Sequence, residues 1–121
     1  FIYPDGRVEP LTRDHSLVKR LEELGHITAD EAVNYPHRNV LYRALGQGEI
    51  LDPDIFTVGF PQPASLMICS AGLWGVLTEQ DITHAVNDAT SLQRACQNLV
   101  NAANAAGGPD NISVILVQLI G

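Results

Sequence analysis

The sequence predicts a single domain of the α+β class, with a mostly antiparallel sheet. Three observations lead to this prediction. Helical segments with an apolar period of 3.6 residues are grouped apart from the strand-like segments, instead of alternating with them regularly. The strand-like segments are short and end at turn residues. The length of 121 residues supports one hydrophobic core but not two.

The first part of the chain predicts a hairpin followed by short helices. Residues 1–3 and 8–12 flank a Pro-Asp-Gly turn signal, which favours a β-hairpin. Thr28 and Glu31 have the spacing of a capping box at the start of a helix. Three helical segments are expected in this part, each ended by a glycine or a proline: residues 14–24, 29–34 and 37–46.

Three strand-like segments follow the hairpin along the chain. Residues 54–60 alternate like a strand with one buried face. Residues 65–70 are almost entirely apolar, which is typical of a strand covered on both faces. The segment 111–120 is rich in β-branched residues, so we expect it to be a central strand.

Two longer helices are predicted between the last two strands. Thr78 is expected to cap a helix that runs to about Asn87. Residues 91–106 keep the 3.6-residue period over the longest stretch, and Gly107 ends it. Trp74, which precedes both helices, is expected to anchor the core.

Composition and charge indicate which binding partners and which cellular compartment to expect. The net charge is −7 with only seven Lys and Arg residues, which argues against binding to a nucleic-acid backbone. The sequence contains neither a membrane-spanning apolar run nor a signal peptide, so we expect no membrane partner. Cys69 and Cys96 are expected to be reduced core thiols of a cytoplasmic protein. The chain begins inside a hairpin, so we expect it to be a piece of a longer protein.

One carboxylate stands apart from the other charged residues. The sequence contains none of the short motifs typical of a catalytic serine, a phosphate-binding loop or a zinc site. Asp110 lies between a glycine-rich helix end and a very apolar strand. A carboxylate at such a place suits a hard cation, either Mg²⁺ or Mn²⁺. The alternative is a turn aspartate that bonds nearby backbone amides, with Asn111 doing likewise.

Two segments, GGPDNISVILVQL and LMICSAGLWGVLTEQDI, resemble the last sequence blocks of the protein phosphatase 2C family of metal-dependent serine/threonine phosphatases. The middle of the chain is similar to a region of bacterial members that includes a mobile flap, here about residues 25–46. The resemblance covers residues 1–119. It implies the C-terminal portion of a phosphatase 2C-like domain over 1–121, without the N-terminal half. The implied fold is a helix-flanked antiparallel β-sandwich with four layers, αββα.

The resemblance also implies a metal site. Members of the family hold Mn²⁺ or Mg²⁺ mainly with aspartates, and a metal-bound hydroxide attacks the phosphoryl group of a phosphoprotein substrate. The family aspartate of the D-N-I-S block matches Asp110, which becomes a predicted metal ligand. The aspartate of the C-S-D-G block matches Ala71, whose methyl group cannot coordinate a cation. Ser70, Gly72 and Asn111 would line the site, and Gly72 would allow close approach of the backbone.

The chain departs from the family pattern in its flap and at its start. Arg38 and Asn39 lie where flap residues approach substrate in relatives, and Tyr35 replaces a frequent histidine. The N-terminal blocks that carry further metal aspartates do not occur in this sequence. We therefore expect that Asp110 alone cannot hold a two-metal centre and that this chain has no phosphatase activity. The alternative is a non-catalytic pseudophosphatase module for protein–protein interaction or regulation.

Two questions stay open from the sequence. The alanine at position 71 is a natural loss, an engineered substitution, or a ligand replaced by another residue, and the sequence does not distinguish the first two. The missing half would also leave sheet edges and an apolar face uncovered. We therefore expect a homodimer or sheet-paired assembly, or pairing with the missing N-terminal half.

Overall fold

The structure, a computed structural model, describes residues 1–12, 21–33 and 52–120. The chain divides into two compact units. One unit consists of Phe1–Leu11 and Gly59–Gly121, and the other of Thr12–Val58. The described part combines helices with a two-stranded antiparallel sheet, which confirms the α+β class. Within it, no helix has the length and apolar character needed to cross a bilayer.

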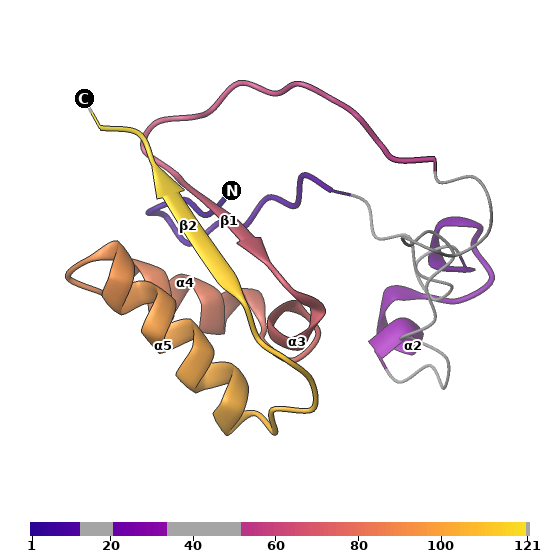
Figure 1. Cartoon of the computed structure of the whole chain (residues 1–121). Coiled ribbons are helices and arrows are strands. Elements are labelled where there is room, and N and C mark those ends of the chain that lie inside the picture. Colours follow the sequence, from indigo (N-terminus) through magenta and orange to yellow (C-terminus); the bar gives the residue numbers. More distant parts are fainter. Residues whose placement is uncertain (13–20, 34–51, 121) are drawn as a thin grey trace. The chain divides into compact units, whose positions relative to one another are not determined.

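The sheet belongs to the first unit and consists of β1, Ser65–Cys69, and β2, Val114–Gln118 (Figure 1). The two strands are antiparallel, with Ser65 opposite Gln118 and Cys69 opposite Val114. The predicted N-terminal hairpin is present as a bridge between Ile2 and Val8, and Ile2 also bridges to Ser65. The start of the chain therefore extends the sheet beside the first residue of β1.

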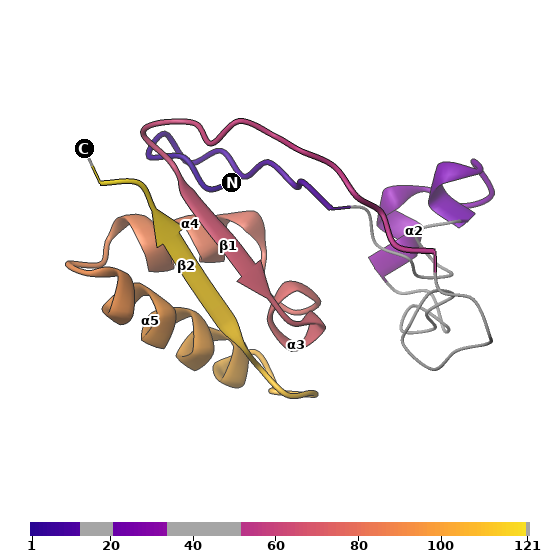
Figure 2. The ribbon, with the colours of Figure 1, turned by 45° about the horizontal axis from the view of Figure 1, so that its top comes forward.

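Two amphipathic helices cover one face of this sheet (Figures 1 and 2): α4, Glu79–Asn87, and α5, Leu92–Ala105. Thr78 caps α4 as predicted, because its hydroxyl accepts a hydrogen bond from the Asp81 amide while the Asp81 carboxylate accepts one from the Thr78 amide. After the C-terminal end of α5, Gly107 has a φ of +123°, a backbone conformation that favours glycine and does not continue the helix.

The core lies between these helices and the sheet. Leu73, Ile82 and Leu99 are fully buried, with 0% of each side chain exposed. They come from α3 (Ala71–Trp74), α4 and α5 respectively. The sheet contributes the side chains of one face, which pack against this cluster: Met67, Cys69, Val114 and Leu116. The prediction for Trp74 was wrong, because this side chain is 37% exposed and the neighbouring Leu73 fills the core instead.

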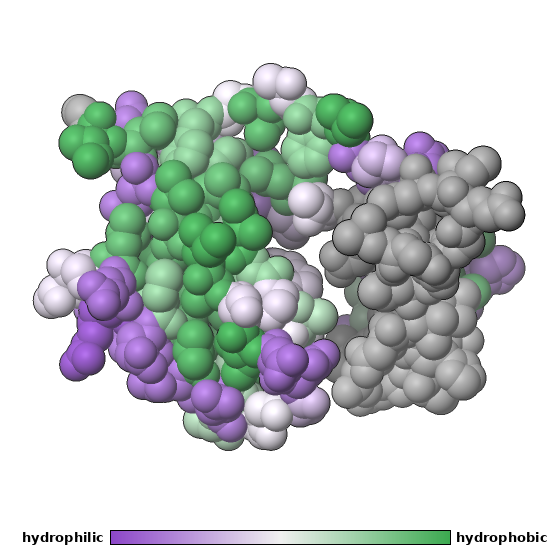
Figure 3. Space-filling model, in the orientation of Figure 1, coloured by the Kyte–Doolittle hydropathy of each residue, from purple (hydrophilic) through white to green (hydrophobic). Residues whose placement is uncertain are grey.

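The opposite face of the same sheet is apolar but exposed. We define the open face by two cross-strand pairs, Leu66 with Val117 and Ile68 with Ile115. Ile68 is 55% exposed and Ile115 is 59% exposed. Figure 3 shows hydrophobic residues gathered over the strands on this side. The expectation of a β1 covered on both faces is therefore wrong for the described part of the first unit, where α4 and α5 lie on one face and Ile68 on the other face is exposed.

The position predicted for the last strand is also wrong. Among the described residues β2 pairs with β1 alone, so its other edge has no strand beside it. The β-branched composition correctly predicted a strand but not its place in the sheet, because strand propensity reflects burial of side chains and not the number of neighbouring strands. The described sheet thus has two strands. The predicted four-layer sandwich is not seen in the described part of the chain and stays a prediction.

The second unit contains α2, Ala29–Val33, and a helical stretch at residues 21–23. The predicted capping box is present, since the Thr28 hydroxyl accepts a hydrogen bond from the Glu31 amide at 3.2 Å and the Thr28 amide donates to the Glu31 carboxylate at 3.4 Å. The rest of the first predicted helix and the whole of the predicted helix 37–46 lie outside the described residues.

The strand predicted over residues 54–60 is absent from the structure, where this segment has no regular secondary structure. Ile55, Phe56 and Val58 are exposed, Ile55 by 91%, and Phe60 alone among the apolar residues of this segment is half-buried, against Phe1. Alternation of apolar and polar side chains creates a strand only where a neighbouring strand and a core receive it. The described part of the chain places neither beside this segment.

Candidate functional site

Antiparallel pairing brings the predicted site residues to one end of the sheet. Since Cys69 lies opposite Val114, the residues that follow β1 meet those that precede β2. The residues after β1 include Ser70 and Gly72. The residues before β2 form a loop over 110–113, which we call the Asp110 loop. The two segments are 41 residues apart in sequence and are joined by direct hydrogen bonds.

Ser70 fastens the end of β1 to the Asp110 loop. Its hydroxyl donates to the carbonyl oxygen of Asn111 at 3.0 Å and accepts from the Ser113 amide at 3.0 Å. The Ser70 amide donates to the Ser113 carbonyl, also at 3.0 Å. The Ser70 hydroxyl makes no capping bond to α3, because its hydrogen bonds go to Asn111 and Ser113 of the Asp110 loop instead. Ser70 therefore positions the site residues and is not a free nucleophile.

Gly72 lets the two segments approach closely. This residue is buried, and a Cβ atom built on it would overlap the carbonyl oxygen of Asn111 and lie 2.8 Å from its carbonyl carbon. The same Cβ would lie 3.2 Å from the carbonyl oxygen of Asp110. Any other residue at position 72 would push the Asp110 loop away from α3. The close approach inferred for Gly72 from the family resemblance is thus a feature of this structure.

Asp110 is exposed at the surface of this loop. Its Oδ1 accepts a hydrogen bond from the Asn111 amide at 2.7 Å, which is the turn-aspartate arrangement considered as the alternative to a metal ligand. An ionised carboxylate has about four lone-pair sites, so this bond leaves capacity to accept further donors or to coordinate a cation. The role of Asp110 as a metal ligand stays a prediction.

Ala71 is the first residue of α3 and is exposed, between Ser70 and Gly72. Its methyl group offers no donor atom at the place where a ligand was expected. The part of the chain described by the structure contains no group of three or more His, Cys, Asp or Glu that could hold a metal ion. Mg²⁺ demands near-octahedral oxygen coordination, and one exposed carboxylate supplies too few of those ligands. The described residues therefore do not fit a metal centre by themselves.

Some predicted residues lie elsewhere. Arg38, Asn39 and Tyr35 lie outside the described residues, so their role at the flap stays a prediction. Cys69 and Cys96 form no disulfide and are both half-buried; Cys69 packs against the core cluster, whereas Cys96 does not belong to it, so the expectation of two core thiols holds only in part. Sequence reasoning missed Ser113, whose backbone amide donates to the Ser70 hydroxyl. Its position three residues after Asp110, directly before β2, was the signal that could have found it.

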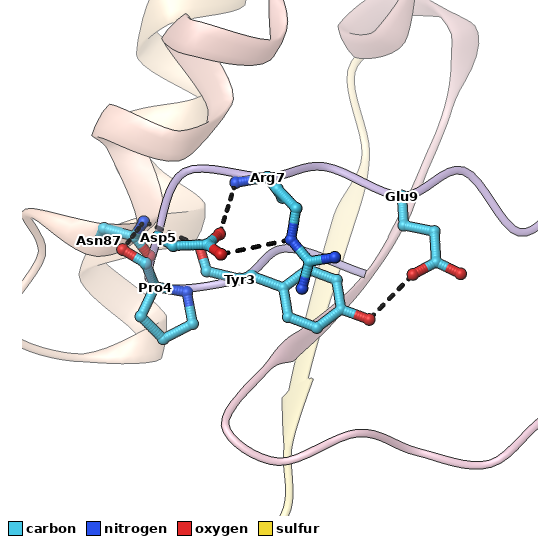
Figure 4. A network of polar contacts seen from close by, with 6 residues as sticks. All are labelled: Tyr3, Pro4, Asp5, Arg7, Glu9 and Asn87. Carbon is cyan, nitrogen blue, oxygen red and sulfur yellow. Dashed lines mark hydrogen bonds and ion pairs between the residues drawn. The ribbon is translucent and has the colours of Figure 1, made fainter.

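A second polar network, also missed, stabilises the N-terminal hairpin in the first unit (Figure 4). The Tyr3 hydroxyl donates to Glu9 Oε2 at 2.9 Å, and this hydrogen bond raises the pKa of Tyr3, with smaller contributions from desolvation and from the Glu9 charge. The Arg7 guanidinium lies over the Tyr3 ring, 4.1 Å from its centroid, and pairs with Asp5 at 3.3 Å. Asn87 of α4 donates to the Tyr3 carbonyl at 3.2 Å. These exposed contacts hold the hairpin on α4 and suggest no chemistry.

Known proteins similar to this chain are bacterial phosphatases. No protein-family model matches the sequence. The serine/threonine phosphatase of Listeria welshimeri is 35% identical over 118 residues, which is 98% of this chain and 47% of that protein. The streptococcal relatives include a protein described as a putative protein phosphatase of the 2C type, 35% identical over 94% of this chain.

Solved structures agree with the sequence comparison. The PPM Ser-Thr phosphatase of Mycobacterium smegmatis superposes with a TM-score of 0.85 at 40% identity, over 98% of this chain and 50% of that one. The serine/threonine phosphatase of Staphylococcus aureus superposes with a TM-score of 0.92 at 27% identity, over 99% of this chain and 47% of that one. The chain spans about half the length of the relatives it matches. It belongs to the bacterial family of PP2C-type serine/threonine phosphatases.

Proposed function

We propose that this chain is part of a metal-dependent protein serine/threonine phosphatase, and that the chain alone does not hydrolyse phosphomonoesters. The observation that carries the first part is the likeness to proteins described as serine/threonine phosphatases, over nearly the whole of this chain and about half of theirs. The substrate class that this likeness supports is a phosphoserine or phosphothreonine protein. The family implies Mn²⁺ or Mg²⁺ as the cofactor.

The second part of the proposal is supported by the composition of the Asp110 loop. Asp110 is a single exposed carboxylate, and Ala71 has no ligand atom. Ser70 and Gly72 hold the loop in place, so this chain would contribute a positioned carboxylate to a site whose other ligands lie in the part of the domain that it does not span. Without those ligands a divalent cation keeps most of its hydration shell and binds weakly.

The direct test is hydrolysis of p-nitrophenyl phosphate and of a phosphothreonine peptide by the purified chain with millimolar Mn²⁺. We expect no turnover above that of the Asp110→Ala variant. Turnover that depends on Mn²⁺ and disappears in Asp110→Ala would refute inactivity, while supporting Asp110 as a ligand. Titration calorimetry with Mn²⁺ adds a readout without substrate, and we expect no binding in the micromolar range.

Ala71 favours a second candidate function, a non-catalytic module of the same family that acts through protein–protein contacts. A chimera separates the two candidates: this chain replaces the matched half of the Mycobacterium smegmatis phosphatase, to which it is 40% identical. Activity of the chimera with Ala71 in place supports a part of an enzyme. Activity that appears only after Ala71→Asp supports the non-catalytic module, because the scaffold is then competent and lacks only this carboxylate.

A further inference from the structure

We propose that Ser70 is a positioning residue for the carboxylate of Asp110. Through the backbone of Asn111, the Ser70 hydroxyl fixes which carboxylate oxygen of Asp110 is left open for a ligand. That this carboxylate serves a phosphatase rests on the proposed function. The positioning itself does not, and it is tested on the chain without metal or substrate.

The first observation is the pair of hydrogen bonds that the Ser70 hydroxyl makes across the end of the sheet. It donates to the Asn111 carbonyl oxygen and accepts from the Ser113 amide, at 3.0 Å in both cases. One atom must therefore donate and accept at the same time, which a hydroxyl can do and a methyl or an ammonium group cannot. Ser70 is half-buried, so competition from water for these two bonds is reduced.

The second observation is that the Asn111 carbonyl is also in contact with α3. A Cβ atom built on Gly72 would overlap this carbonyl oxygen and lie 2.8 Å from the carbonyl carbon. The Asn111 carbonyl thus has an attractive contact with Ser70 Oγ and a close packing contact with Gly72. Together these two contacts restrict the direction in which the carbonyl points.

The third observation connects Asn111 to the carboxylate. The Asn111 amide donates to Asp110 Oδ1 at 2.7 Å. Only the two backbone rotations of Asn111 separate its amide from its carbonyl, so a fixed carbonyl restricts the direction of the amide as well. The carboxylate that accepts from this amide is then restricted in turn. Among the described residues Asp110 Oδ2 has no hydrogen-bond partner, so it is the oxygen left open.

A main-chain hydrogen bond of Ser70 allows a substitution to isolate the hydroxyl. The Ser70 amide donates to the Ser113 carbonyl at 3.0 Å, and this bond does not involve the side chain. In Ser70→Ala the antiparallel contact between the two segments therefore remains, and only the two hydroxyl bonds are lost. The variant is a test of positioning because the loop stays attached to the end of β1.

The test measures the side-chain conformation of Asp110 by NMR in the full 121-residue chain. Three-bond couplings from its backbone nitrogen and carbonyl carbon to Cγ report the χ1 rotamer populations. We expect one dominant rotamer in the unaltered chain and averaging among rotamers in Ser70→Ala. Ser70→Thr keeps a hydroxyl and should restore the dominant rotamer. Exchange of the Ser113 amide should be roughly 2- to 10-fold faster in Ser70→Ala, because its acceptor is lost.

The matched control is Ser91→Ala. It removes another serine hydroxyl of the first unit, which accepts from the Arg94 amide at 3.1 Å and caps α5. This variant should be less stable, as expected for a lost cap, but should leave the Asp110 couplings unchanged. The control therefore separates positioning of Asp110 from a general loss of stability. Circular dichroism verifies that each variant is folded.

Three results would overturn the proposal. Asp110 could sample several rotamers already in the unaltered chain, or Ser70→Ala could leave its couplings unchanged. The third is that Ser91→Ala or Ser70→Thr alters the couplings as much as Ser70→Ala does. None of these results depends on whether the chain hydrolyses a phosphomonoester, so this proposal and the proposed function can fail separately.

Discussion

The two faces of the β1–β2 sheet are built from similar apolar side chains, but one face is packed against a core and the other is exposed. On one face, Met67 and Leu116 pack against a core in which Leu99 is fully buried. On the other face, Ile68 and Ile115 stand opposite each other and are more than half exposed. Hydrophobicity of the strands therefore does not determine burial. What differs is the presence of α4 and α5, which cover one side only (Figures 1 and 2).

The comparison shows that the described residues of the first unit form a closed core on the helical face of the sheet, whereas Ile68 and Ile115 on the other face are exposed. Its helical side has the caps, the close packing and the buried aliphatic side chains of an ordinary domain core. Its open side has the composition of a core without the covering layer. This difference agrees with the half-length match to the phosphatases, and it can be tested by substitutions on the two sides.

The largest expected effect comes from truncating one aliphatic residue on each side. Leu99→Ala should lower the free energy of unfolding by about 2–5 kcal/mol, since it leaves a cavity in the closed core. Ile115→Ala should lower it by less than about 1 kcal/mol, because water already contacts most of this side chain. Urea denaturation followed by circular dichroism measures the unfolding free energy of both variants. Equal losses would contradict the difference in burial between the two faces.

A second prediction concerns the end of the sheet where the Asp110 loop lies. Gly72→Ala should cost about 1–3 kcal/mol of unfolding free energy, because the added methyl group overlaps the Asn111 carbonyl. Gly59→Ala is the matched control: nothing lies within 4 Å of the added atom, and the expected change is less than about 0.5 kcal/mol. Amide chemical shifts of residues 110–113 should move in the first variant only. Unchanged shifts there would mean that the two segments are not in contact.

A third prediction tests the cap of the helical layer. Thr78→Ala removes the hydroxyl that accepts from the Asp81 amide at 3.1 Å, and should cost about 1 kcal/mol. The exposed Thr90, outside both helices, provides the control, and Thr90→Ala should change stability by less than about 0.5 kcal/mol. If the two variants have the same urea midpoint, the capping box contributes nothing to the layer that closes the core.

The smallest effect is expected at the N-terminal hairpin, and it depends on pH. Because its hydroxyl donates to the Glu9 carboxylate, the pKa of Tyr3 lies above its ordinary value of 10.0. A raised folded-state pKa means that this bond stabilises the hairpin below pH 10 and is lost as the pH rises through the folded value. Glu9→Gln should lower the pKa of Tyr3 toward 10.0, as measured by NMR of its ring carbon. An unchanged titration curve would contradict this assignment.

Local chemistry made much of the fold predictable from the sequence. Thr78 marks the start of α4, and Gly107 follows the end of α5. Both were predictable because capping depends on residues only a few positions apart. The strand β1 was also predictable from its apolar run. Whether both of its faces are covered was not, because an apolar run specifies a tendency to be buried and not the layer that does the burying.

Tertiary context accounts for the predictions that were wrong. Residues 54–60 alternate like a strand, but no neighbouring strand in the described part of the chain receives them. Trp74 was expected to anchor the core, whereas α3, whose Gly72 packs against the Asp110 loop, buries Leu73 instead. Both outcomes depend on contacts with residues far away in the sequence.

The candidate site was found through the family resemblance more than through the residue pattern. From the pattern alone, a turn role is favoured for Asp110 over a metal ligand, and its bond to the Asn111 amide shows that this local role is real. The meeting of Ser70 and Gly72 with the Asp110 loop requires the register of β1 and β2, which no short motif specifies. Ser113 was missed for the same reason.

The most direct test of the account compares the isoleucine methyl groups of the two faces by NMR. The methyl signals of Ile68, Ile115 and Ile82 are recorded at low protein concentration, with and without a soluble nitroxide that broadens exposed groups. The account predicts strong broadening at Ile68 and Ile115 and little at Ile82, whose side chain is fully buried. Equal protection of all three would contradict it, because the open face would then already be covered in the chain itself.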